Sequence, residues 1–316
     1  MKTDREALLV NRREFLAAGA IAAAALTGVS TLAEECRSNA PGRPLLKLAV
    51  KYGMIRPGAT VLDKFELLKR LGYEGVELDS PGGPPVEEVI EASRRTGIRV
   101  PGVVDSVHWN KTLSDRDPSV RAEGRAALEQ AIRDCKAYGG GTVLLVPAVV
   151  NKQVAYADAY RRSQEEIRKV LPLAVELNIK IAIENVWNNF LLSPLESARY
   201  IDEFESAHVG WHFDPGNIVN YGWPEDWART LGHRILRLDI KEFSRKKRDD
   251  EGLWKGFAVE IGEGDCDWPA IMEALAEIGY SGWACAEVGG GDEARLMDIL
   301  VRMRRVLTWP ARPGPD

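Results

Sequence analysis

Four carboxylates stand at equivalent places in the second half of the chain, each closing a short apolar run. They are Glu184, Asp214, Asp239 and Glu287, at the ends of the runs 180–184, 209–214, 235–239 and 283–287. Four like charges gathered in a partly dry place would repel one another unless a cation lay between them. An all-oxygen ligand set suits a hard divalent ion. We therefore predict a metal site at these residues, for Mn²⁺ or Mg²⁺.

Helix capping is the alternative role for an acidic residue that lies between a strand and the next helix. For any one of the four carboxylates, capping explains the residue as well as metal binding does. Capping is a poor explanation for four carboxylates in register on successive strands. The metal site therefore remains the prediction.

From about residue 45 the chain alternates short β-type runs with helical patterns. The predicted strands are 46–52, 75–78, 99–104, 142–146, 180–184, 209–214, 235–239 and 283–287. The predicted helices are 61–71, 86–96, 119–138, 156–177, 193–204, a shorter piece after Pro224, 268–278 and 292–307. Strands that alternate with helices indicate parallel strands joined by right-handed crossovers.

Eight strand–helix units match the size of a closed barrel, which takes about 250 residues. An open doubly wound sheet would normally carry a glycine-rich phosphate-binding turn after its first strand. The sequence Tyr52-Gly53-Met54-Ile55 is not such a turn. We therefore predict a (β/α)8 TIM barrel, a single domain over residues 45–308, followed by a tail at 309–316.

Reacting groups in such a barrel project from the C-terminal ends of the strands, so the four carboxylates should share one rim. His108, in the loop beyond the third strand, is a candidate substrate contact, although a lone loop histidine more often has no such role. Alternation along the strands points His212 and Arg237 inward, one layer below the rim. We predict that both contact the metal ligands and offset their charge. Plain packing inside the barrel is the alternative.

The first forty residues resemble an export signal. Arg12 and Arg13 precede Phe15 and an apolar, alanine-rich run over 17–26, after which small residues follow. This is the layout of a secretory signal, and the paired arginines resemble those of the twin-arginine type. The apolar run is too short to span a bilayer comfortably. We expect residues 1–40 to direct export to the periplasm or another extracytoplasmic place, and the mature form to have no membrane span.

The charge balance and the cysteine content argue against several other classes of protein. The 42 Lys and Arg stand against 47 Asp and Glu, for a net charge of −5, so the basic balance of a nucleic-acid-binding protein is missing. Cys135, Cys266 and Cys285 have no paired spacing, and neither a disulfide framework nor a thiolate zinc site is predicted.

Several segments resemble the xylose isomerase-like barrel superfamily. They read GYEGVELDSPGG, IAIENVWNNFLLSPLE, WHFDPGNIVNYGWPE, RLDIKEF and GEGDCDWPAIMEALAEIGYSGWACAEV. Within the superfamily they are most similar to the sugar (phosphate) isomerase/epimerase branch, to which the tagatose/psicose 3-epimerases are related. The similarity spans about residues 45–305. Its Gly-x-Gly-x-x-Asp segment is specific to the superfamily and not to one substrate.

The resemblance implies that Glu184, Asp214 and Glu287 are metal ligands. The family's fourth ligand is usually a His in a His-x-Lys-Asp stretch, where this chain has Asp239 followed by Ile240-Lys241-Glu242. Aspartate at this place keeps an oxygen donor and disfavours zinc.

The substrate contacts that we predict rest partly on the same resemblance. Asn217 replaces a His of the epimerases, and Arg245 matches one of their Arg residues. Lys241 and Arg245 would hold substrate hydroxyls or polarise an oxyanion, although for Arg245 a solvated basic loop is the open alternative. Trp187, like Trp109 and Trp254, lies in a predicted rim loop, where it would stack on a sugar ring or its aglycone or else pack beneath the loops.

The activity implied is that of a divalent-metal-dependent isomerase or epimerase acting on a keto-sugar or related polyol ketone. Glu184 would remove the proton α to the carbonyl and Glu287 would return it on the opposite face, or the reverse. The nearest alternative is a lyase or dehydratase that begins with the same proton removal and then expels a β-substituent from a keto-sugar or 3-keto-glycoside. Export favours it, because phosphorylated sugars are scarce outside the cytoplasm.

Two further alternatives are weaker. A non-catalytic carbohydrate-binding barrel would not need the complete carboxylate set. The apurinic endonucleases of the superfamily use three zinc ions and many His ligands, and this chain has only 4 His. The expected partner is therefore a small sugar and not nucleic acid, and the resemblance also implies a homo-oligomer.

Overall fold

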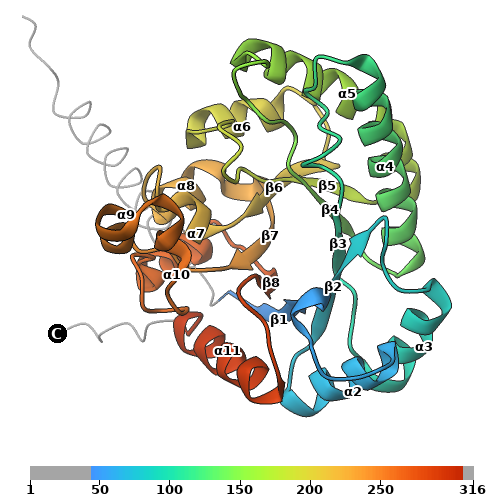
Figure 1. The fold of residues 1–316 in the computed structure, drawn as a ribbon, viewed down its shortest axis with the longest axis vertical. Helices are drawn as coiled ribbons and strands as arrows, with labels where there is room; N and C mark the ends of the chain where they lie inside the picture. The colour runs from blue at the N-terminus through green and yellow to red at the C-terminus, as the bar shows by residue number, and fades with distance from the viewer. Residues whose placement is uncertain (1–43, 309–316) are drawn as a thin grey trace, which may run out of the picture. The chain divides into compact units, whose positions relative to one another are not determined.

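The computed structural model describes residues 44–308, which form a closed barrel (Figure 1). Eight parallel strands pair in chain order, and β1 closes the ring against β8. The strands are β1 (Leu46–Lys51), β2 (Gly75–Ser80), β3 (Gly102–Asp105), β4 (Thr142–Leu145), β5 (Lys180–Ile183), β6 (Val209–Phe213), β7 (Ile235–Ile240) and β8 (Gly282–Ala286). The predicted (β/α)8 TIM barrel is confirmed.

Helices surround the strands (Figure 1). They are α2 (Val61–Leu71), α3 (Val86–Thr96), α4 (Pro118–Ala137), α5 (Tyr156–Leu177), α6 (Pro194–Asp202), α7 (Pro215–Ile218), α8 (Pro224–Leu231), α9 (Arg245–Glu251), α10 (Trp268–Glu277) and α11 (Glu293–Val306). Short 3-10 turns lie at η1 (Tyr52–Met54), η2 (Gly232–Arg234) and η3 (Leu253–Phe257).

Burial on two sides explains the apolar strands. All residues of β4 and β6 are buried, because helices cover their outer face and other strands fill the space inside. The helices instead have a single apolar face: α2 buries Val61, Phe65 and Leu68 at helical spacing. A capping box between Thr60 and Asp63 starts this helix.

The layer of side chains below the rim is set by strand register. His212 of β6 lies beside Arg237 of β7, and Asp239 lies beside Cys285 of β8. The Arg237 side chain crosses the interior to Thr142, and a Cβ at Gly102 would come within 2.6 Å of its guanidinium. Glycine in β3 therefore leaves the room that a buried arginine needs.

Some predicted boundaries shift. The third strand was predicted from residue 99 but runs from Gly102, because Pro101 has no N–H and leaves only an isolated bridge between Arg99 and Gly75. The polar segment after β7 was predicted to be a loop, yet it contains α9. Its sequence RKKRDDE has no apolar stripe, so only the cap, where Ser244 accepts from the Lys247 N–H at 3.2 Å, could have indicated a helix.

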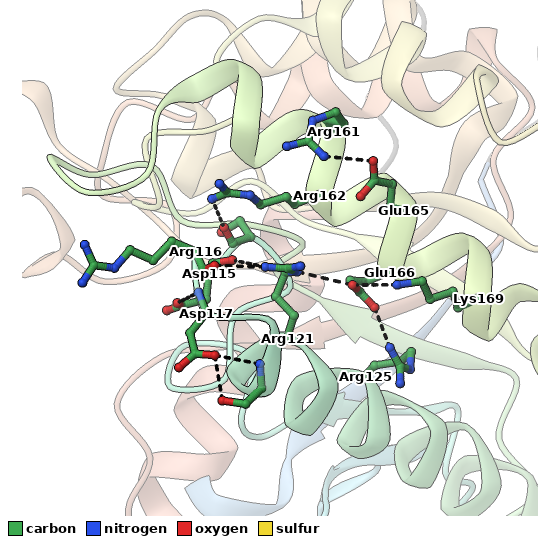
Figure 2. A network of polar contacts seen from close by, with 12 residues as sticks. Asp115, Arg116, Asp117, Arg121, Arg125, Arg161, Arg162, Glu165, Glu166 and Lys169 are labelled. Atoms are coloured by element: carbon green, nitrogen blue, oxygen red, sulfur yellow. Dashed lines mark hydrogen bonds and ion pairs between the residues drawn. The ribbon is translucent and has the colours of Figure 1, made fainter.

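A polar network joins α4 and α5 on the outside of the barrel (Figure 2). The Glu166 carboxylate is 3% exposed and accepts hydrogen bonds from Arg121 at 3.3 Å, Arg125 at 2.7 Å and Lys169 at 2.8 Å. Arg121 also donates to the backbone carbonyl of Asp115 at 2.8 Å. These contacts connect the two helices to each other and to the preceding loop.

The remaining predictions about the chain concern its ends and its cysteines. Within residues 44–308 no helix has the length and apolar character needed to cross a membrane. Cys135, Cys266 and Cys285 are buried free thiols. The predicted export signal at 1–40 and the tail at 309–316 lie outside the described residues.

Candidate active site

The four predicted carboxylates meet at the C-terminal end of the barrel. Glu184 and Asp214 directly follow β5 and β6, Asp239 lies in β7, and Glu287 directly follows β8. One oxygen from each lies within 4.8 Å of those of the other three. Glu184, Asp214 and Asp239 are buried, whereas the Glu287 side chain is 37% exposed. The sequence prediction thus identified a real cluster with one member open to solvent.

Helix capping accounts for only one of these four residues. Asp214 Oδ1 accepts the Asn217 N–H of α7 at 3.1 Å, so Asp214 is both a cap and a member of the cluster. The caps of the helices that follow β5 and β8 are Ser193 and Asp292. Glu184 and Glu287 therefore have no capping role to explain their presence.

Two lysines lie among the carboxylates. Lys51, at the end of β1, places Nζ 2.8 Å from Asp239 Oδ2 and 3.8 Å from Glu287 Oε1. Lys241, just after β7, places Nζ 2.9 Å from Asp214 Oδ2 and 2.5 Å from Glu287 Oε2. The two ammonium groups therefore lie near different oxygens of Glu287.

From the sequence we predicted a role for Lys241 but none for Lys51. The signal was available, because Lys51 ends an apolar strand just as the carboxylates do.

Of the two side chains predicted to contact the cluster from the layer below the rim, only one does so directly. His212 Nε2 lies 3.1 Å from Asp239 Oδ1, which is the kind of contact that we predicted. Arg237 contacts none of the four carboxylates; its Nη2 lies 3.0 Å from Glu77 Oε1. Glu77 also pairs with Lys51. Arg237 therefore acts on the cluster only through Glu77 and Lys51.

The pKa values of the acidic groups follow from burial and charge. Burial raises the pKa of Glu184 well above its usual range, and Glu287 and Asp214 add to the rise. Burial also raises the pKa of Asp214, to about 6, against the opposing effect of Lys241. For Asp239 the effect of burial is outweighed by Lys51 and His212, which lower its pKa. Of the three buried carboxylates of the cluster, Glu184 is thus the one most disposed to take up a proton.

The donor set fits a divalent cation. Four carboxylates offer oxygen atoms from separate strands, within a distance that one ion can bridge. Together with Glu77 they make five formal negative charges, against the three positive charges of Lys51, Arg237 and Lys241. The negative charges outnumber the positive ones, so the residues present suit a divalent cation in both ligand chemistry and the sign of their excess charge.

A cavity of about 570 Å³ opens beside the cluster, on the side of β5 to β8. Asn217, Lys241 and Glu287 border it. The Asn217 side chain donates to Glu184 Oε1 at 3.0 Å and accepts from Lys241 Nζ at 3.3 Å, which links the cavity to the buried Glu184 carboxylate. Trp187 also lines the cavity.

Two predicted substrate contacts lie elsewhere. His108 is buried and its Nδ1 accepts the Val146 N–H at 3.2 Å, and it does not line the cavity. Arg245 donates from Nε to the Val219 carbonyl at 3.1 Å and from Nη2 to the Gly222 carbonyl at 2.8 Å. The guanidinium of Arg245 thus holds the loop between α7 and α8 and does not border the cavity.

Glu242 explains the glycine-rich motif of the sequence. Its carboxylate is buried and accepts from the N–H groups of Gly262 at 2.8 Å and Cys266 at 3.0 Å, and from Trp268 Nε1 at 2.9 Å. A Cβ at Gly264 would lie 2.6 Å from the Glu242 side chain. The Gly-x-Gly-x-x-Asp segment therefore wraps around Glu242, which itself lines the cavity.

The fold and this rim define a family. The chain belongs to the xylose isomerase-like TIM barrel family, whose model matches residues 65–305. Among curated proteins it is similar to the L-ribulose-5-phosphate 3-epimerase UlaE of Escherichia coli O1:K1 / APEC. The two are 25% identical over 252 residues, which cover 75% of this chain and 85% of the relative.

Solved structures with the same fold include three named proteins. A D-psicose 3-epimerase crystallised in the presence of D-fructose has a TM-score of 0.67 at 20% identity, covering 83% of this chain and 99% of the other. The 3-keto-D-glucoside 4-epimerase YcjR of E. coli has a TM-score of 0.69 at 16% identity, covering 83% of this chain and 98% of the other. The IolI protein with a bound zinc atom has a TM-score of 0.68 at 17% identity, again covering 83% of this chain and 98% of the other. The predicted family and its epimerase neighbours are confirmed.

Proposed function

We propose that the chain is a divalent-metal-dependent sugar epimerase or isomerase that moves the proton α to the carbonyl of a keto-sugar. The observation that carries the proposal is the meeting of Glu184, Asp214, Asp239 and Glu287 beside a cavity. The names of its relatives, which are 3-epimerases and a 4-epimerase of sugars, support the same class of reaction.

The four carboxylates would hold the ion, and we propose Mn²⁺ or Mg²⁺ because every donor is an oxygen. When bound, the ion would polarise the substrate carbonyl and so make the adjacent C–H more acidic. Asp214 and Asp239, buried and held by Lys241 and Lys51, would serve as ligands only.

Two glutamates would carry the proton. Glu184 is buried, and the Asn217 side chain donates to its Oε1 at 3.0 Å, which would orient a carboxylate that accepts a proton. Glu287 stands across the cluster on a strand that is not adjacent to β5, and its side chain is open to the cavity. Glu184 would remove the proton from one face of the carbon and Glu287 would return it on the other, or the reverse. Lys241 would neutralise Glu287 and Asp214 and keep their oxygens in place.

Solvent exchange provides the test. Full-length protein loaded with Mn²⁺ is incubated in D₂O with ketohexoses, inososes and 3-keto-glucosides, and proton NMR follows the signal α to the carbonyl. We expect loss of this signal together with a diastereomeric product. Release of a β-substituent in the same experiment would change the assignment to a lyase, which begins with the same proton transfer.

Glu184→Gln should lower exchange by about 10² to 10⁴-fold, the usual contribution of a positioned base. The control is Glu87→Gln, an exposed glutamate in the first turn of α3, which should exchange at the wild-type rate. Full turnover by Glu184→Gln with metal bound would contradict the assignment of the base.

We also propose export through the twin-arginine pathway, supported by Arg12, Arg13 and the apolar run that follows them. Arg12→Lys combined with Arg13→Lys should retain the protein in the cytoplasm. Fractionation of cells that express either chain would measure this.

A further inference from the structure

One wall of the cavity beside Glu287 is aromatic. The rings of Trp187 and Trp254 lie 4.9 Å apart between centroids, and Phe257 packs edge-on against Trp187 at 5.4 Å. All three line the cavity, and Trp254 remains 66% exposed. An exposed indole in a concave wall leaves apolar area in contact with water. Stacking of a ligand ring on the indole would remove this area from water.

The cations at the cavity are already paired. Lys241 contacts Asp214 and Glu287. Arg295 donates from Nη1 to Glu260 at 2.8 Å and to Asp298 at 3.0 Å, and from Nε to the Gly289 carbonyl at 3.0 Å. The two cations that line the cavity, Lys241 and Arg295, thus already have carboxylate partners, with which a phosphate group would have to compete.

The helix after β8 does not provide an anion site either. Phosphate sites in TIM barrels often use the loops after strands 7 and 8 together with a helix N-terminus. Here the Asp292 carboxylate caps α11 by accepting the Arg295 N–H at 2.9 Å, and Glu293 lies in the first turn. Two negative charges at this place would repel a phosphate.

The size of the cavity also bears on the kind of substrate. At about 570 Å³ it falls within the range of sites that enclose drug-sized ligands, and one sugar ring at Glu287 would leave the space along Trp254 unfilled. We propose that the substrate is an uncharged keto-sugar that carries a second ring, as in a glycoside or disaccharide. The reacting ring would lie at Glu184 and Glu287, and the second ring against Trp187 and Trp254. This inference rests on the proposed function, because it assigns the substrate of that same site.

Binding of unreactive ligands tests the inference without turnover. The probes are methyl β-D-glucopyranoside, phenyl β-D-glucopyranoside and D-glucose 6-phosphate, titrated calorimetrically into the full-length protein with Mn²⁺ present throughout. They have no ketone, so the result does not depend on whether the chain is an epimerase. We expect the phenyl glycoside to bind roughly tenfold more tightly than the methyl glycoside, since a ring contact contributes about 1.4 kcal/mol. The 6-phosphate should bind no more tightly than the methyl glycoside.

Two tryptophan variants locate the second ring. Trp254→Ala should remove the preference for the phenyl glycoside. The matched control is Trp223→Ala, because Trp223 is 65% exposed but does not line the cavity, and this variant should retain the preference. Both residues are exposed, so neither substitution opens a hole in the core.

The inference is overturned if the wild-type protein shows no preference for the phenyl glycoside or no binding of it. It is also overturned if the preference survives Trp254→Ala, or if the 6-phosphate binds most tightly. A preference that depends on Trp254, found together with no proton exchange on any keto-sugar, would contradict the proposed reaction and leave the binding site standing.

Discussion

The two halves of the barrel rim have similar polar residues and use them differently. Asp105, the last residue of β3, and His108, in the loop that follows, are 1% and 7% exposed, and the N–H groups of Val107 and Val146 donate to them. At the ends of β5 to β8, four carboxylates converge within 4.8 Å, and one of them, Glu287, lines a cavity. A place at the end of a barrel strand therefore does not by itself make a functional residue. The difference is that the carboxylates of the second half converge on one another and that one of them, Glu287, opens to a cavity.

Protonation separates the two halves further. Burial lowers the pKa of His108 to about 4, with a smaller contribution from Lys51, so its imidazole is neutral at pH 7. Burial raises the pKa of Asp105 to about 7, and no cation opposes the rise. On the other side, Lys51 and His212 outweigh the effect of burial on the pKa of Asp239, and Lys241 opposes the rise in the pKa of Asp214. Of the two sides, therefore, only the carboxylate cluster has lysines that oppose the effect of burial.

The largest effect is expected when an aspartate of the carboxylate cluster is replaced by asparagine, and the same replacement at the end of β3 serves for comparison. Asp239→Asn removes a charge that contacts Lys51 and His212, and it should lower Mn²⁺ affinity by at least about tenfold and proton exchange by about 100-fold or more. Calorimetric titration with Mn²⁺ and the D₂O assay measure the two effects.

Asp105→Asn is the control for this experiment and should change neither quantity by more than about twofold. Equal losses in the two variants would remove the distinction between the halves.

The second largest effect is expected on the free energy of unfolding, through the proton that Asp105 holds. Asp105 keeps its proton to about pH 7 when folded but releases it near pH 4 when unfolded. Between these values the unfolded state binds fewer protons, so the free energy of unfolding falls as pH rises, by at most about 4 kcal/mol. Asp105→Asn does not ionise and should escape this loss.

Urea denaturation at pH 5 and pH 8, with EDTA present to keep metal binding out of the comparison, measures the change. The advantage of the variant over the wild type should grow towards pH 8. An advantage that shrinks with pH would mean that Asp105 is stabilised as a carboxylate.

The third effect lies outside the rim, in the network of Figure 2. Glu166→Gln would leave Arg121, Arg125 and Lys169 without their common carboxylate, at a cost of about 2–3 kcal/mol because Glu166 is buried and its partners are partly exposed. Urea denaturation should show this loss, while the exchange rate per folded molecule stays at the wild-type value. A loss of exchange without a loss of stability would connect the network to the site.

The fold and the carboxylate cluster could be predicted from the sequence because both depend on short-range patterns. Apolar runs that alternate with helices fix the barrel, and the last residue of each run falls on the rim. Asp239 was found in this way even though the resemblance favours a His at its place.

The partners of the cluster could not be predicted in the same way, because they depend on which side chains reach across the interior. Lys51 approaches Asp239 from a strand 188 positions earlier in the chain, and Arg237 reaches Glu77 instead of its neighbours on β6 and β8. Strand register gives a residue its layer, but the length and rotamer of a long side chain decide what it contacts. The same limit applies to Arg245, which the resemblance places near the substrate.

The smallest expected effect concerns Arg245. Its guanidinium holds the carbonyls of Val219 and Gly222 and lies over the Trp223 ring at 5.3 Å, all away from the cavity. Arg245→Met should therefore cost about 1–2 kcal/mol of stability through the lost hydrogen bonds, and should change KM by less than about twofold. Lys241→Met, by contrast, should lower kcat, because Lys241 contacts Asp214 and Glu287 directly. Urea denaturation and steady-state kinetics on the best substrate of the panel measure both variants. A large rise in KM for Arg245→Met at unchanged stability would return Arg245 to the substrate contacts and extend the functional half of the rim to α9.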